Sequence, residues 1–237
     1  MEQKVKISDL ISYLIKPLVY ISIGIIIIAF LLHFNDNFVN LKYGWIIRKF
    51  DIRRENNVAV WFESNLFLLV ALSFVPLGFS KELKTEFNKF VKFFFQISVF
   101  GFVFLALDEM ISVHEYLGKF VENRTGITEG TNIEEVGFGW ILIYAPIVFV
   151  GSFFVWSIWS KLLKELDGKS YKVGKKFVIL IIIGAISTVL MEVVEGFFWF
   201  ENKVDTIFPC FEEGIEFMTL ISFLVCNNIL IKGFEKE

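Results

Sequence analysis

Long apolar segments alternate with short polar ones along the chain. Residues 21–32 and 177–186 are almost continuously apolar, and a helix of about 20 such residues crosses the hydrocarbon core of a bilayer. A membrane β-barrel would instead show segments of about 10 residues with alternating polarity. The pattern predicts an all-α polytopic transmembrane helical bundle with about six transmembrane helices, over residues 17–34, 57–79, 90–116, 137–161, 176–200 and 209–232.

The composition supports lipid as the main surrounding medium. Of the 237 residues, 55% are hydrophobic and 18% aromatic, and the mean hydropathy is +0.63, whereas soluble domains have about 45–50% apolar residues. No Pro/Gly/Ser-rich linker or low-complexity tract separates the spans. We therefore expect residues 1–237 to form one integral membrane domain.

Lysine-rich loops indicate how the helices are oriented. Positively charged loops stay in the cytoplasm, and two of the predicted loops are basic. This predicts a multi-pass protein of the cell membrane with cytoplasmic termini. The lysines are Lys81, Lys84, Lys89 and Lys92 between spans two and three, and Lys161, Lys164, Lys169, Lys172, Lys175 and Lys176 between spans four and five.

The first loop opposes this orientation. It is basic, although the prediction places it outside. Phe38, Leu41 and Trp45 recur at helical spacing, so we interpret the loop as a short interfacial helix whose basic face lies among lipid headgroups. An inverted topology and a five-span arrangement remain alternatives. The basic residues are Lys42, Arg48, Lys49, Arg53 and Arg54.

Charge and cysteine content limit the classes of partner. The net charge is −3, and no basic stripe with interleaved aromatic residues is present, so nucleic acid is not an expected partner. Cys210 and Cys226 are too few for a disulfide framework. Membrane lipids are the expected partners, and the possibility of a homo-oligomer stays open.

Ionisable residues crowd the end of predicted span three. Asp108, Glu109, His114 and Glu115 fall within two turns. In one continuous helix, with 100° between successive residues, Asp108 and Glu115 share a face and His114 lies well around from it. His114 therefore need not address the same ligand as Asp108.

Carboxylates also gather where spans two, five and six meet the same side of the membrane. Glu192 and Glu195 stack at i, i+3 near the end of span five, and Glu213 and Glu216 do so near the start of span six. Span two carries Glu63 about two turns inside. The predicted metal ligands are Asp108, Glu109, Glu115, Glu192, Glu195, Glu213 and Glu216.

The negative charge of these carboxylates must be balanced. Unpaired carboxylates in a low dielectric cost several kcal/mol each. They can be balanced by protons, by a divalent cation such as Ca²⁺, Mg²⁺ or Mn²⁺ bound through oxygen ligands, or by Arg53 and Arg54 if the first loop folds back. The alternative interpretation is that many of these acids sit in headgroups or water, with Glu212 and Glu213 favoured by the helix dipole.

Three segments resemble an uncharacterised set of bacterial multi-spanning proteins. They are a Leu-Asp-Glu-x-x-x-x-His-Glu stretch at 107–115, an Asn-x-x-x-Trp-Phe-x-Ser stretch at 57–64 and a Glu-Glu-x-x-Glu stretch at 212–216. The resemblance implies a polytopic architecture and a recurring acidic constellation, without a reaction. Ala59 and Glu63 stand near positions where the second motif would have proline and serine, so the resemblance assigns Glu63 no role.

Three functions fit these observations. The first is a carboxylate-rich site at one membrane face that binds a divalent cation or protons for transport, as a channel, or for a cation-gated conformational change. The second is a metal-dependent enzyme acting on lipid at the outer leaflet, with Glu109, His114 or Glu115 as general base and Ser64 or Ser112 as a nucleophile. The third is a non-catalytic membrane sensor or assembly subunit, with loop 117–136 as its contact surface.

Two known classes are excluded by their residues. Hydrolases that hold zinc through three histidines need one more than the two histidines in this chain. The metalloprotease sequence H-E-x-x-H is absent, because no second histidine follows His114 by four residues.

Overall fold

A computed structural model of the 237-residue chain describes residues 6–35, 47–52, 57–79, 89–126, 138–197 and 208–235. Within these ranges all regular structure is helical, and six helices are long and apolar enough to cross a membrane. The predicted all-α polytopic bundle is thereby confirmed. The six helices are α1 (Ile7–Phe34), α2 (Val58–Phe79), α3 (Lys89–Ile111), α6 (Ile141–Leu163), α7 (Gly168–Phe197) and α8 (Phe208–Phe234).

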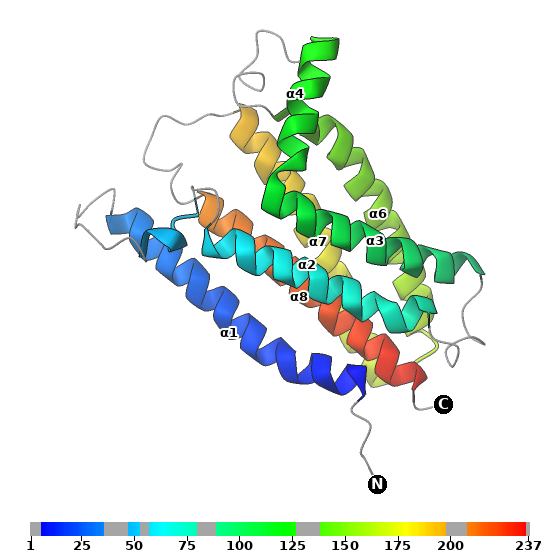
Figure 1. The fold of residues 1–237 in the computed structure, drawn as a ribbon. Coiled ribbons are helices and arrows are strands. Elements are labelled where there is room, and N and C mark those ends of the chain that lie inside the picture. Colours follow the sequence, from blue (N-terminus) through cyan, green and yellow to red (C-terminus); the bar gives the residue numbers. More distant parts are fainter. Residues whose placement is uncertain are drawn as a thin grey trace.

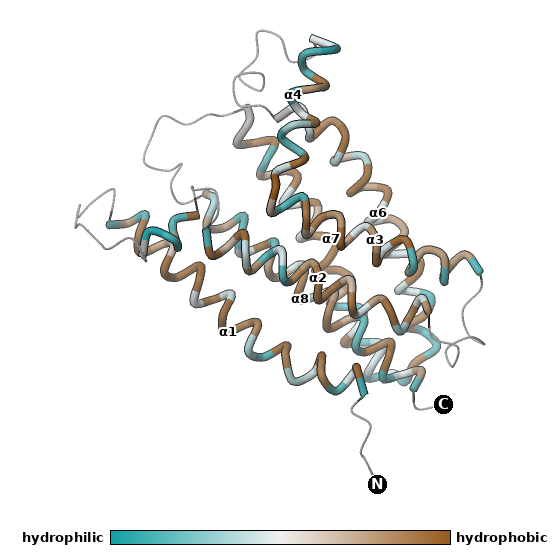
Figure 2. The backbone as a smooth tube through the Cα atoms, in the orientation of Figure 1, coloured by the Kyte–Doolittle hydropathy of each residue, from teal (hydrophilic) through white to brown (hydrophobic). Residues whose placement is uncertain are grey.

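The six helices alternate in direction, so the bundle has two unlike ends (Figure 1). At one end, which we call the terminal face, α1 begins and α8 ends. At the other end, which we call the acidic face, α1, α3 and α7 finish while α2, α6 and α8 begin. Hydrophobic residues run along the middle of the long helices, and hydrophilic residues concentrate nearer the ends (Figure 2).

Helix α8 is the central helix of the bundle. In its most apolar stretch 67% of residues are buried by protein, against 11% in α6, so α6 presents most of its surface to the surroundings. α8 packs against α1, α2 and α7, while α3 packs on α2 and α6 on α7. α7 and α8 approach closely at Gly184, where a Cβ atom would overlap the side chain of Thr219. Small residues permit such contacts between membrane helices.

Aromatic side chains fill the space between α2, α3, α6 and α8. Phe74 lies at the centre, with its ring centroid 5.9 Å from that of Phe95, 5.7 Å from Trp159 and 6.2 Å from Phe223. Phe74, Phe95 and Trp159 are fully buried. Mixed edge-on and tilted ring contacts of this kind add specific geometry to apolar packing.

A buried amide joins three helices beside this aromatic cluster. Asn227 of α8 accepts a hydrogen bond from the Trp159 indole N–H of α6 at 3.2 Å. Its amide NH₂ donates to the Ser73 hydroxyl of α2 at 2.9 Å. With hydrogen bonds to two neighbouring helices, the amide fixes the register of α8 within the bundle.

The terminal face is held by polar contacts between the first and last helices. The Ser8 hydroxyl donates to Glu235 at 2.9 Å, and Asn228 donates to the Ser12 hydroxyl at 2.8 Å. Lys232 pairs with Asp9 at 3.4 Å. α1 is therefore fastened along the C-terminal half of α8.

The helix expected over residues 90–116 is interrupted. α3 ends at Ile111, Ser112 adopts a left-handed backbone conformation with φ 52°, and a separate helix, α4 (Val113–Thr125), begins. Part of the segment expected as polar loop 117–136 is therefore helical. α4 packs on the short helix η4 (Phe138–Trp140), where the Gly139 N–H donates to Glu122 at 2.9 Å.

Only the end of the basic first loop belongs to the described residues. The short helix η2 (Ile47–Phe50) exposes Arg48 and Lys49, and Asp51, which follows it, lies 3.8 Å from the ring nitrogen of buried His33. The loop thus folds back onto the end of α1. The residues on which the predicted interfacial helix and the arginine pairing depend, Phe38, Leu41, Trp45, Arg53 and Arg54, lie outside the described ranges.

The Asn227 amide yields a prediction about stability. Asn227→Ala removes two interhelical hydrogen bonds and leaves the buried Trp159 N–H unpaired, so the free energy of unfolding should fall by about 1 to 3 kcal/mol. Unfolding in detergent, followed by circular dichroism, measures the loss. The matched control is Asn65→Ala, because Asn65 is exposed and bonds only within its own helix. An equal loss in the two variants would contradict the role given to Asn227.

Candidate functional site

Three glutamates meet near the acidic face. Glu63 comes from α2, and Glu213 and Glu216 come from α8, where the i, i+3 spacing stacks their side chains on one side of the helix. One carboxylate oxygen from each lies within 4.8 Å of the other two. We call these three residues the carboxylate cluster.

The cluster lies inside the helices rather than at their tips. Glu63 is five residues beyond the start of α2 and Glu216 eight residues beyond the start of α8, which at 1.5 Å per residue corresponds to about 7 and 12 Å along the helix axes. Phe62 and buried Phe217 pack edge to face beside it, with centroids 5.1 Å apart. Glu63 itself is only 2% exposed. Water is therefore largely kept from its carboxyl group.

The described residues provide no cation to balance the cluster. Within those ranges no Lys or Arg forms an ion pair with Glu63, Glu213 or Glu216, and one buried oxygen of Glu63 and one of Glu213 have no hydrogen-bond partner. Buried polar groups are normally paired, so the cluster has free ligand capacity.

Glu109 of α3 brings a fourth carboxylate near the cluster. The Ser64 hydroxyl donates to the Ala106 carbonyl at 2.8 Å and holds α2 against α3. Glu109 is one turn beyond Ala106, on the side of α3 that faces α2. It is close enough to interact electrostatically with Glu63, Glu213 and Glu216. The helix contact thus places Glu109 next to the cluster.

Asp108, the neighbour of Glu109, does not join the cluster but contacts α4 and α6. One of its oxygens accepts the backbone N–H of His114 at 2.7 Å and lies 3.2 Å from His114 Nδ1. The other accepts the Tyr144 hydroxyl of α6 at 2.9 Å. Asp108 is 4% exposed. Both of its oxygens are therefore used to hold the start of α4 and to join it to α6.

The expectation that His114 lies well around the helix from Asp108 is wrong. It assumed one continuous helix, in which the two residues point apart. The left-handed turn at Ser112 swings α4 out of line with α3 and brings the His114 ring onto Asp108. The same ring packs edge-on against Trp140 at 5.0 Å.

His114 lies outside the spanning segments, and its protonation is shifted. Burial of the ring opposes protonation, but the hydrogen bond that His114 donates to Asp108 and the charges of Asp108, Glu109 and Glu115 outweigh it, so the pKa of His114 is raised above its ordinary value. The Asp108 contact also fixes the ring so that Nε2 is directed away from the carboxylate.

The other predicted ligands lie apart from the cluster or outside the described side chains. Glu115 is 45% exposed and lies 3.8 Å from Lys119, one turn along α4. Glu192 of α7 is half-buried and does not belong to the cluster. The side chain of Glu195 is outside the described part of the structure. Of the seven predicted ligands, Glu213 and Glu216 lie in the cluster and Glu109 beside it.

Glu63 was missing from the predicted ligands, although it is the most buried member of the cluster. The departure from the recurring motif at this position argued against a role. A sequence signal did exist, because Glu63 is an acid well inside an apolar span with no basic residue within a turn of it. Only the packing of α2 on α8 shows that it meets Glu213 and Glu216.

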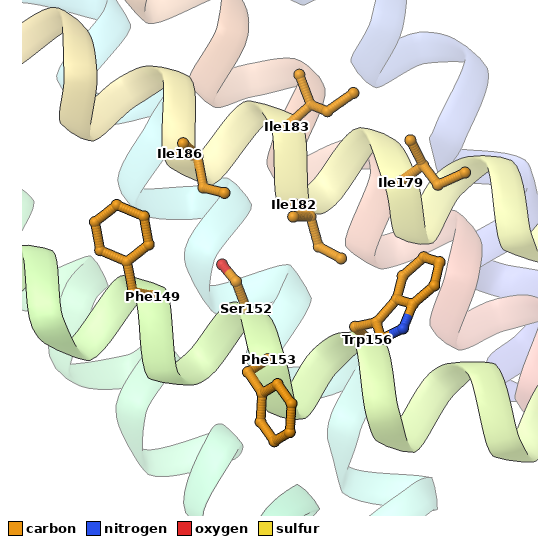
Figure 3. Close-up of a pocket in the computed structure, with 8 residues that line it drawn as sticks. All are labelled: Phe149, Ser152, Phe153, Trp156, Ile179, Ile182, Ile183 and Ile186. Carbon is orange, nitrogen blue, oxygen red and sulfur yellow. The ribbon is translucent and has the colours of Figure 1, made fainter.

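A separate hollow of about 390 Å³ lies between α6 and α7. Figure 3 shows Ser152 directed toward a ring of isoleucine and aromatic side chains. The lining residues are Phe149, Ser152, Phe153, Trp156, Ile179, Ile182, Ile183 and Ile186. Its lining suits hydrocarbon rather than ions, and it includes none of the clustered carboxylates.

Comparison with known proteins places the chain in a family without adding a reaction. No curated protein and no solved structure matches it. Residues 19–228, which include all six helices in whole or in large part, match the family described as Domain of unknown function (DUF8692). The chain belongs to this family of uncharacterised domains.

Proposed function

We propose that this integral membrane protein binds a divalent cation at Glu63, Glu213 and Glu216, with Glu109 as a further ligand, and uses the site for transport or for a cation-gated conformational change. Protons neutralise the carboxylates when the cation is absent. The observation that carries the proposal is the convergence of three carboxylates within 4.8 Å, one of them fully inside the bundle, without a described cationic partner.

The geometry suits a hard cation. Ca²⁺ holds its oxygen ligands at about 2.3–2.6 Å, so two ligands on opposite sides are separated by up to about 5 Å. The observed limit of 4.8 Å falls within that span. Mg²⁺ and Mn²⁺ would require the side chains to move slightly inward. Oxygen-only ligands exclude the softer thiolate chemistry of zinc and copper sites.

The location suits transport or gating better than a purely structural site. The cluster joins α2 to α8, and Glu109 adds α3. Without a cation, the carboxylates on these three helices repel one another. A bound cation draws the three helices together, so its presence changes the free energy of their packing. A site between helices near one membrane face is also reachable from water on that side.

Binding of Mn²⁺ tests the proposal directly. Purified protein in detergent should bind Mn²⁺ and gain thermal stability by about 2.7 kcal/mol when the free cation exceeds Kd 100-fold. Glu63→Gln and Glu216→Gln should abolish binding, measured by electron paramagnetic resonance of free Mn²⁺. Without the cation neither variant should be less stable than wild type, because each replaces a carboxyl group by a neutral amide of similar shape.

Ser98→Ala is the matched control, because Ser98 lies on α3 and bonds only to the Phe94 carbonyl of its own helix. It should bind Mn²⁺ like wild type. Uptake of Mn²⁺ into proteoliposomes would identify transport, and binding without uptake would identify a gated change. The proposal is wrong if Mn²⁺, Ca²⁺ and Mg²⁺ all fail to bind and leave the melting temperature unchanged.

The Asp108–His114 contact favours a second candidate, a metal-dependent enzyme that acts on lipid. A carboxylate that accepts from Nδ1 leaves Nε2 of the histidine as the basic nitrogen, and the raised pKa keeps that nitrogen a strong base. His114 is 25% exposed at the side chain, at the membrane face that also holds the cluster. Among the earlier base candidates, the structure therefore favours His114 over Glu115, which pairs with Lys119.

Lipid turnover distinguishes this candidate from the first. If the protein is an enzyme, wild-type protein with Mn²⁺ should convert lipid extracted from its host membrane, followed by mass spectrometry. His114→Gln should slow that conversion by at least about 100-fold, whereas Mn²⁺ affinity should fall by no more than a few-fold. If neither wild type nor His114→Gln converts lipid although both bind Mn²⁺, the enzyme candidate is wrong and the cation site stands without it.

We also propose that the protein lies in the cell membrane with its terminal face in the cytoplasm. Exposed lysines gather at that face, at the start of α3, the end of α6 and the start of α7. Positive residues near helix ends favour the cytoplasmic side. The acidic face would then be open to the outside of the cell.

Cysteine labelling of intact cells tests this orientation. Asn123→Cys on α4 and Lys172→Cys on α7 both replace exposed residues, in a background with Cys210 and Cys226 changed to alanine. A membrane-impermeant maleimide should label position 123, and should label position 172 only after the cells are broken. The reverse pattern would place the acidic face in the cytoplasm.

A further inference from the structure

The break between α3 and α4 has an unusual construction. Ser112 is the one described non-glycine residue with positive φ, a conformation that costs about 1 to 2 kcal/mol for a residue with a side chain. The surroundings must therefore hold it in place. Asp108 does so, because its carboxylate spans the break and accepts the backbone N–H of His114, the second residue of α4.

The same carboxylate connects the break to another helix. Its second oxygen accepts the hydroxyl of Tyr144, which belongs to α6, and Tyr144 packs edge-on against Trp140 at 5.4 Å. The end of α3 is thus fastened at both oxygens of one side chain. We call Asp108 and its partners His114 and Tyr144 the latch.

Glu109 is adjacent to the latch in the chain but lies on a different side of α3. It lies on the side of α3 that the Ser64–Ala106 hydrogen bond holds against α2, next to the carboxylate cluster. Successive helix residues diverge by 100°, so anchoring Asp108 toward α4 and α6 sets the direction of Glu109. Rotation of the last turn of α3 would move both carboxylates together.

We infer that Asp108 is a positioning residue, which through the latch directs Glu109 onto the carboxylate cluster and does not itself bind the cation. This inference rests on the proposed cation site. It accounts for why an acid next to the cluster has both oxygens occupied by protein donors, whereas oxygens of Glu63 and Glu213 are left unpaired.

The test weakens the latch by two substitutions of different severity and measures the affinity of each variant for Mn²⁺. Tyr144→Phe removes only the bond to one oxygen, and Asp108→Asn keeps an acceptor for the His114 N–H while losing the charge and the second acceptor. Mn²⁺ affinity should fall a few-fold in the first and about 10-fold in the second, the lower end of the range for loss of a partner that orients a ligand. Glu216→Gln should abolish binding, and Ser98→Ala should leave it unchanged.

Two readouts separate positioning from general stability. The spectrum of bound Mn²⁺ should change in Asp108→Asn, because the ligand geometry around the ion changes. Spin labels on α4 and α1, at the exposed positions 116 and 20, should show a broader distance distribution in that variant without any metal. If Asp108→Asn does not fold, Tyr144→Phe carries both measurements.

The outcomes distinguish this inference from the proposed function. A broadened distance distribution with unchanged Mn²⁺ affinity and spectrum would overturn the positioning role and leave the cation site intact. Complete loss of binding in Asp108→Asn, equal to that in Glu216→Gln and with the label distances unchanged, would make Asp108 a ligand and also overturn it. Absence of Mn²⁺ binding in wild type would overturn the cation site and the inference together.

Discussion

The electrostatic cost of grouped carboxylates is the constraint around which this bundle is organised. Glu63, Glu213 and Glu216 bring their oxygens within 4.8 Å of one another, and Glu109 stands beside them. In a medium from which water is largely excluded, like charges at that separation are strongly unfavourable. The packing of α2 against α8 brings them together nevertheless, so the folded state needs protons or a cation to neutralise this end of the bundle.

In the middle of the bundle, a buried polar side chain is fully paired with protein groups. Asn227 is fully buried, yet both ends of its amide are satisfied by Trp159 and Ser73. Neutral groups paired in this way stabilise the arrangement of helices without needing a ligand. The contrast within one helix is informative, because α8 carries a satisfied amide near the terminal face and unsatisfied carboxyl groups near the acidic face. Single buried oxygens of Ser160 and Asn228 are also without a partner, so the cluster differs in that its unpaired oxygens belong to carboxyl groups gathered from two helices.

Much of the architecture could be predicted because it depends on composition along single helices. Span number follows from runs of apolar residues, and the gathering of acids at one face follows from the alternation of helix directions. What could not be predicted depends on contacts between helices. Glu63 joins the site only because α2 packs on α8, and nothing in residues 58–79 alone specifies that neighbour. The break at Ser112 was missed for a related reason, since no glycine or proline marks it and a carboxylate four residues earlier provides the cap.

That cap also explains why neighbouring acids in one motif have different roles. A helix end leaves backbone N–H groups without partners, and a nearby carboxylate satisfies them with a strong, charge-assisted bond. Asp108 satisfies such an N–H group at the start of α4. Glu109, turned by 100° and free of the helix end, remains available to the cluster. The pair Asp108–Glu109 therefore combines a carboxylate that holds the helix break with one that stays available to the cluster, and the position of the break decides which residue takes which role.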